Sequence, residues 1–359
     1  MTTRIRMHEG RAEITVLPED ALPDRSPFLT ALVEAAGALL TWDVTADSPL
    51  PEAHVHDADA ASAWLHEVYG AATTTAVLRG RDTVVEVEPD PDILRAVLTL
   101  GHLSWARAWW PASGGVPSLD PALLAAEIAA ESHRIAHLLD DEDAVERAVI
   151  EARDAPSVLA GLPPGLAADG IRLSSILAGL AEDEGVVLAP ATPSAHRAEW
   201  ALAAGGDHGA LSLTGVVVAE GSAPVQWSDV PAQTVDAAAE ARWALHQQTD
   251  AAWLQVEVTA VDGVSSKSAL RARFGPAELD VDVPLEFDGT RFRGAIVAPS
   301  AAVFLPLRDR ILWVRDPAAA PSPGEPESAE ERARVLRFAA DRLRATDATL
   351  AEQAAAARA

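Results

Sequence analysis

The stretch ELDVDVPLEFDG, residues 278–289, decides the fold of the second half of this chain. Its apolar residues recur at every second position and face one side, while acidic residues between them face the other. This period of two is typical of a half-buried strand in an antiparallel sheet. Asp288 and Gly289 close the stretch with a hairpin-turn signal, because both residues tolerate a positive φ.

Similar short apolar runs, residues 302–306 among them, continue through residues 186–316. About seven such strands predict an antiparallel β-sandwich-like domain. A two-residue turn at residues 288–289 and a short loop at residues 275–278 set the expected register, in which opposite charges meet across strands. The predicted cross-strand pairs are Glu286–Arg291, Leu285–Phe292, Arg273–Asp280 and Arg271–Asp282.

The first half of the chain has a different pattern. Residues 1–90 predict a small α/β region, in which residues 26–42 have helical spacing and Asp57 caps a helix that ends near Gly70. Residues 91–185 read as a helical region. Together with the β domain, these regions predict an α+β multidomain fold.

The C-terminal part begins with a Pro/Ala-rich linker, residues 317–327. An amphipathic helix is expected over residues 328–357, with a capping box formed by Ser328 and Glu331. Apolar residues spaced one heptad apart form its expected contact stripe. This stripe predicts docking either onto the chain's own domains or onto a partner, through Leu336, Leu343 and Leu350.

Composition excludes several kinds of chemistry. The absence of cysteine from all 359 residues removes disulfides, thiolate nucleophiles and cysteine-based zinc sites. A net charge of −26 repels nucleic acid and anionic membranes, so a protein is the expected partner. With no signal-like or membrane-spanning apolar run, we expect a soluble, cytoplasmic protein, and no motif indicates a cofactor.

Tryptophan is concentrated in one segment, LSWARAWWPAS, at residues 103–113. Trp105 and Trp109 lie one helical turn apart, and Trp110 points about 100° away from them. Indole and guanidinium groups are enriched in binding hot spots. The segment therefore predicts either a core at a domain junction or a partner or ligand contact through Trp105, Arg107, Trp109 and Trp110.

Two histidine pairs are candidate metal ligands. His54 and His56 would project the same way from a strand, in a string that departs from the H-x-H-x-D-H motif at residues 58 and 59. His133 and His137 have the spacing of one helical turn, followed by Asp141, but Arg134 stands where zincins carry a glutamate. Structural histidines are the alternative in both places.

These observations favour a non-enzymatic interaction protein, such as a scaffold, adaptor or regulatory subunit. Two alternatives remain from other classes. One is a metal-assisted hydrolase that uses a histidine pair. The other is a small-molecule sensor that uses the tryptophan segment.

Overall fold

The computed structural model describes residues 1–17, 26–46, 50–191, 215–249, 251–262, 269–279, 281–319 and 327–358. They form two compact units. Unit 1 comprises residues 1–108, 120–193 and 345–357, and unit 2 comprises residues 109–119, 194–344 and 358–359. The last helix of the chain is thus part of the unit that contains its first strand.

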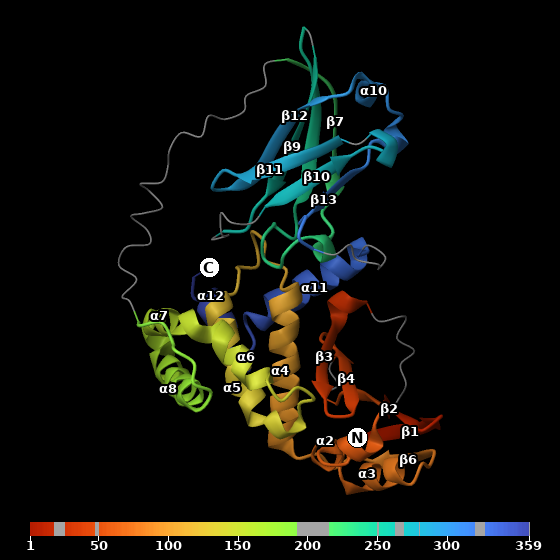
Figure 1. The fold of residues 1–359 in the computed structure, drawn as a ribbon, viewed down its shortest axis with the longest axis vertical. Coiled ribbons are helices and arrows are strands. Elements are labelled where there is room, and N and C mark those ends of the chain that lie inside the picture. Colours follow the sequence, from red (N-terminus) through yellow and green to blue (C-terminus); the bar gives the residue numbers. More distant parts are fainter. Residues whose placement is uncertain are drawn as a thin grey trace. The chain divides into compact units, whose positions relative to one another are not determined.

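Unit 1 combines an antiparallel sheet with helices (Figure 1). The strand order is β3-β4-β5-β2-β1-β6. The strands are β1 (Thr2–His8), β2 (Arg11–Leu17), β3 (Thr30–Ala35), β4 (Ala38–Asp43), β5 (Glu52–Val55) and β6 (Thr83–Glu86). The helices are α1 (Ala58–Ala61), α2 (Leu65–Tyr69), α3 (Ala71–Leu78), α4 (Pro91–Trp109), α5 (Pro121–Arg134), α6 (Ala144–Glu151), α7 (Ala155–Ala160), α8 (Ala167–Asp183) and α12 (Leu350–Ala356).

The helix expected over residues 26–42 is wrong, because β3 and β4 form a hairpin there. The β3 side chains alternate between buried and exposed, with Ala31 and Val33 inside and Leu32 outside. Gly37 makes the turn with a φ of 74°. A Cβ atom at this position would lie 2.3 Å from the Asp57 carbonyl oxygen, so only glycine fits the connection.

Unit 2 is built on one seven-stranded antiparallel sheet with the order β13-β10-β11-β12-β9-β8-β7. The strands are β7 (Val216–Pro224), β8 (Glu240–Gln247), β9 (Ala252–Thr259), β10 (Leu270–Phe274), β11 (Val281–Phe287), β12 (Arg291–Ala298) and β13 (Leu312–Arg315). Helices α10 (Ser300–Val303) and α11 (Ala329–Arg342) accompany it. The α+β multidomain fold with an antiparallel β domain is confirmed, and its strands form a single curled sheet. The run at residues 302–306, expected to add a strand, does not form one, and its first two residues belong to α10.

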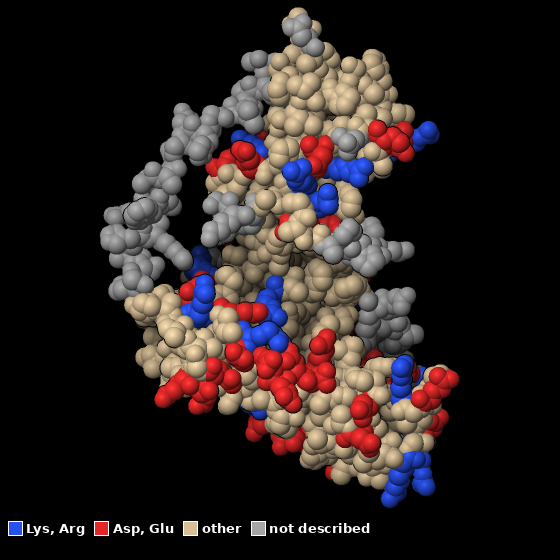
Figure 2. Space-filling model, viewed as in Figure 1, with Lys and Arg blue, Asp and Glu red and all other residues tan. Residues whose placement is uncertain are grey.

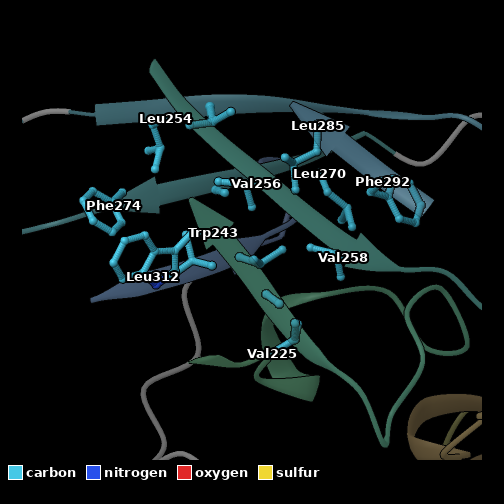
Figure 3. Packing of buried hydrophobic residues seen from close by; sticks show 14 of the residues in the cluster. Val225, Trp243, Leu254, Val256, Val258, Leu270, Phe274, Leu285, Phe292 and Leu312 are labelled. Atoms are coloured by element: carbon cyan, nitrogen blue, oxygen red, sulfur yellow. The ribbon is translucent and has the colours of Figure 1, made fainter. Parts of the chain in front are cut away.

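The inner face of this sheet holds the core of unit 2 (Figure 3). Trp243 and Phe274 come from β8 and β10, and their ring centroids lie 4.8 Å apart. The indole of Trp243 also covers Gly221 on β7, where a Cβ atom would lie 2.7 Å from the ring. Burial of the inner residues is what orients the opposite face of β7, β8 and β9 toward solvent.

The predicted faces of β10, β11 and β12 are correct, but the register is wrong by two residues. Phe287 pairs with Phe292, and Arg273 pairs with Asp282. The Asp288 carboxylate accepts hydrogen bonds from the backbone N–H groups of Thr290 and Arg291. The loop between β11 and β12, residues 288–290, is three residues long. An even shift leaves every side chain on its expected face.

The helix expected over residues 328–357 is wrong as a single element, since α11 ends at Arg342 and α12 begins at Leu350. Ser328 and Glu331 form the predicted capping box. Thr349 and Glu352 form a second one that starts α12. This second box satisfies N–H groups at a new helix start, so it favours a break over a continuous helix.

Candidate functional site

The tryptophan segment is mainly core. Trp105 and Trp110 are each 2% exposed. The Trp105 Nε1 atom donates to the Phe28 carbonyl oxygen at 2.9 Å within unit 1, and the Trp110 Nε1 atom donates to the Pro117 carbonyl oxygen at 2.9 Å within unit 2. Arg107 is exposed and pairs with Glu151 at 2.6 Å, and Trp109 is half-buried. The partner contact predicted for this segment stays a prediction, with Arg107 and Trp109 as its accessible side chains.

The two candidate histidine pairs lie on different elements of unit 1. His54 and His56 are exposed at the end of β5. His133 is on α5, but that helix ends at Arg134, so His137 lies beyond it and its Nε2 atom is 2.8 Å from Glu67 Oε2. Asp141 bonds to Arg147 instead. Within the described ranges, no group of three or more histidine, aspartate or glutamate side chains is placed to hold a metal ion.

The C-terminal leucines do not form one stripe. Leu336 and Leu343 are half-buried, and the buried residues of α11 are Val335 and Ala339. Leu350 is buried at the start of α12 in unit 1. The break between α11 and α12 therefore divides the predicted contact residues between the two units.

Sequence patterns did not indicate the polar cluster that holds α12. The His102 Nε2 atom lies 2.8 Å from Glu352 Oε1, and the Glu352 side chain is 0% exposed. The Glu127 carboxylate accepts hydrogen bonds from the N–H groups of Leu350 and Ala351 at 2.6 and 2.9 Å. Burial raises the pKa of Glu127 to about 7, although these two N–H groups oppose the shift. The T-x-x-E string at residues 349–352 could have indicated the start of α12, because it matches a capping box.

A different part of the molecule, one end of the unit 2 sheet, exposes apolar side chains. We define the apolar end by residues from β7, β9, β12 and the β12–β13 connection. Because the sheet is antiparallel, the start of β7 and β9, the end of β12 and the start of β13 lie at the same end. The residues are Val216, Val217, Val218, Trp253, Val297, Phe304, Leu307 and Ile311.

The exposure of this end is high. Phe304 is 83% exposed, Leu307 is 79% exposed and Val216 is 71% exposed. In Figure 2, the surface over α10 and the start of β7 shows no charged side chain in this view. Clustered exposed apolar groups of this kind mark binding surfaces more often than scattered ones do.

The strand register explains how the apolar end is organised. Val217 pairs with His246, His246 with Trp253, and Trp253 with Val297, so these side chains form one row across four strands of the outer face. The burial pattern confirms that the alternate residues of β8 and β9 point into the core.

Below this row, the outer face is hollowed into an open groove of about 450 Å³. Glu220, Arg242 and Glu257 supply its charges, and small residues such as Ser222 and Ala244 leave the space. The Glu257 carboxylate is neutralised by Arg291 at 3.0 Å and Arg293 at 3.3 Å. Among the described residues, none forms an ion pair with Glu220. Within the described ranges, the groove thus offers an acidic group without an ion-pair partner beside an apolar row. This group, Glu220, is on the edge strand β7, and the cationic Arg242 lies one strand further in, on β8.

Comparison with known proteins gives no match, either to a family model, to a curated protein or to a solved structure. None of the described helices combines the length and apolar character that a membrane span requires.

Proposed function

We propose that this chain is a non-enzymatic interaction protein, of the scaffold, adaptor or regulatory-subunit kind. It binds a partner protein through the apolar end of unit 2. The partner's contact surface is apolar with basic side chains beside it, because the chain carries a net charge of −26 and Glu220 lies unpaired among the described residues next to the valines.

The single observation that supports this proposal most is the exposure of Phe304, Leu307 and Val216 at one end of one sheet. Leaving a phenylalanine and a leucine in water forgoes about 1.5–3 kcal/mol of transfer free energy for each side chain. A partner that covers these two side chains gains this transfer free energy, whereas side chains left in water do not.

The proposal is tested by the stoichiometry of a co-purifying protein. The double variant Phe304→Ser/Leu307→Ser is compared with Ile171→Ser, a control on α8 that removes an apolar side chain of 72% exposure. We expect a partner at fixed stoichiometry with the unchanged chain and with the control, and its loss from the double variant.

Two results would contradict the proposal. One is a partner that the double variant retains in full. The other is a stoichiometric metal ion, found by elemental analysis and lost in His133→Ala or His54→Ala, which would favour the hydrolase alternative.

A further inference from the structure

The edge of the unit 2 sheet at β7 leaves hydrogen-bonding groups unpaired among the described residues. β7 is nine residues long and lies at the end of the strand order, where β8 is its one pairing partner in the part of the chain that the structure describes. The backbone N–H and C=O groups on its other side therefore point away from the sheet. Edge strands of this length are templates for pairing with another chain.

Devices that protect edge strands are weak in the first half of β7. Its sequence begins with three valines, residues 216–218, which are 71%, 46% and 45% exposed. Two features protect this edge weakly against pairing with another chain. They are the register shift between Val217 and Ala219 and the single charge of Glu220. The opposite edge of the same sheet, β13, is only four residues long. The contrast singles out β7 as the open edge.

We infer that β7 accepts an extended segment of a basic partner protein as an added antiparallel strand, which specifies how the proposed function is carried out and rests on it. Main-chain hydrogen bonds to β7 supply the affinity, and alternate side chains of the segment supply the selectivity. The segment extends the apolar row beyond Val217 and places a basic side chain against Glu220.

Charge selects a basic segment over a second copy of this chain. Two copies would bring together two molecules of net charge −26 and would place both Glu220 carboxylates at one junction. An arginine or lysine opposite Glu220 instead gains an attractive cross-strand pair. The groove has room for a long basic side chain on the outer face. An added strand would lie next to Glu220 on β7, whereas Arg242 is one strand further in on β8.

The test uses a labelled nine-residue peptide of alternating valine and threonine with one central arginine, titrated with the full chain and followed by fluorescence anisotropy. Val217→Lys places a charge on the edge, and we expect it to raise Kd on the order of tenfold, equivalent to about 1.4 kcal/mol. The matched control is Val84→Lys on β6, an edge strand of unit 1 whose Val84 is 52% exposed. We expect no change in Kd for the control.

A charge exchange tests the role of Glu220. Glu220→Arg is expected to weaken binding of the arginine peptide by about threefold, in keeping with a cross-strand charge pair. A peptide with glutamate in place of arginine should show the reverse preference. If the arginine and glutamate peptides bind the unchanged chain and Glu220→Arg with the same Kd, then Glu220 does not contribute to selecting the segment.

Three results overturn the inference as a whole. They are no binding of the arginine peptide, equal weakening by Val217→Lys and Val84→Lys, or a chain dimer in sedimentation that Val217→Lys dissociates. Failure here is distinguishable from failure of the proposed function. If Phe304→Ser/Leu307→Ser releases the partner while Val217→Lys and Glu220→Arg retain it, the apolar end binds without strand addition.

Discussion

The Nε2 atom of His102 lies 2.8 Å from the Oε1 atom of Glu352, although 250 positions separate the two residues in the sequence. The imidazole also stacks on Trp105, with ring centroids 5.7 Å apart. Through this contact the last helix of the chain is joined to α4, so residues near the C-terminus complete the core of unit 1.

Glu352→Ala should destabilise unit 1 by about 2–4 kcal/mol, because it leaves His102 and the Thr349 N–H group without their buried carboxylate. The measurement is urea unfolding together with hydrogen exchange of residues 345–357. Glu182→Ala, which removes an exposed carboxylate from α8, is the control and should change little. Equal stability of the two variants would contradict the structural role of Glu352.

The stability of unit 1 should fall as the pH rises through about 7. Burial, aided by the Glu352 and Glu131 carboxylates, raises the pKa of Glu127 from 4.5 to about 7 in the folded chain. Between these two values the folded state binds more protons than the unfolded state, so stability decreases with pH by up to about 1.4 kcal/mol per unit.

Glu127→Gln removes this titration. Urea unfolding at several pH values should therefore show a flatter dependence between pH 5 and 7 in the variant than in the unchanged chain. An unchanged slope would assign the dependence to other groups.

Gly101→Ala should destabilise the chain even though alanine is the better helix former. A Cβ atom at Gly101 would lie 2.1 Å from the Trp42 ring, and such overpacking costs about 1–3 kcal/mol. The helix-propensity gain of about 1 kcal/mol does not offset it. Gly179→Ala on α8 meets no atom within 4 Å and should stabilise, so thermal unfolding of the two variants should shift in opposite directions.

The two capping boxes should act on separate helices. Thr349→Ala should cost about 1 kcal/mol and speed hydrogen exchange in residues 350–356 alone. Ser328→Ala should do the same in residues 329–342. Faster exchange across both helices in either variant would indicate that α11 and α12 unfold together.

Local patterns predicted the element types well where one residue or period decided them. The Asp57 carboxylate accepts hydrogen bonds from the N–H groups of Asp59 and Ala60, as expected of the predicted helix cap. The alternation in residues 281–287 predicted the buried face of β11. The helical spacing of residues 26–42 misled, because a stretch rich in alanine and leucine fits both periods and Gly37 decides between them.

The candidate site was much less predictable. The tryptophans of residues 105–110 stood out by composition, yet two of the three indoles are buried in the core. Their N–H groups donate hydrogen bonds to the carbonyl oxygens of Phe28 and Pro117, which permits this burial. The apolar end was missed, since Phe304, Leu307 and Val216 resemble core residues when they are taken one at a time. Exposure depends on what packs over a residue, and a linear pattern does not contain that information.

By itself, the sequence determined the element types of most segments, the faces of the unit 2 strands, the acidic charge and the lack of thiol chemistry. These properties follow from local periodicity, capping and composition. Only the tertiary structure decided the two-residue register shift, the return of α12 to unit 1, the burial of Trp105 and Trp110, and the exposed end at β7. Each of those depends on contacts between residues distant in the sequence, whose free energies are set by packing in three dimensions.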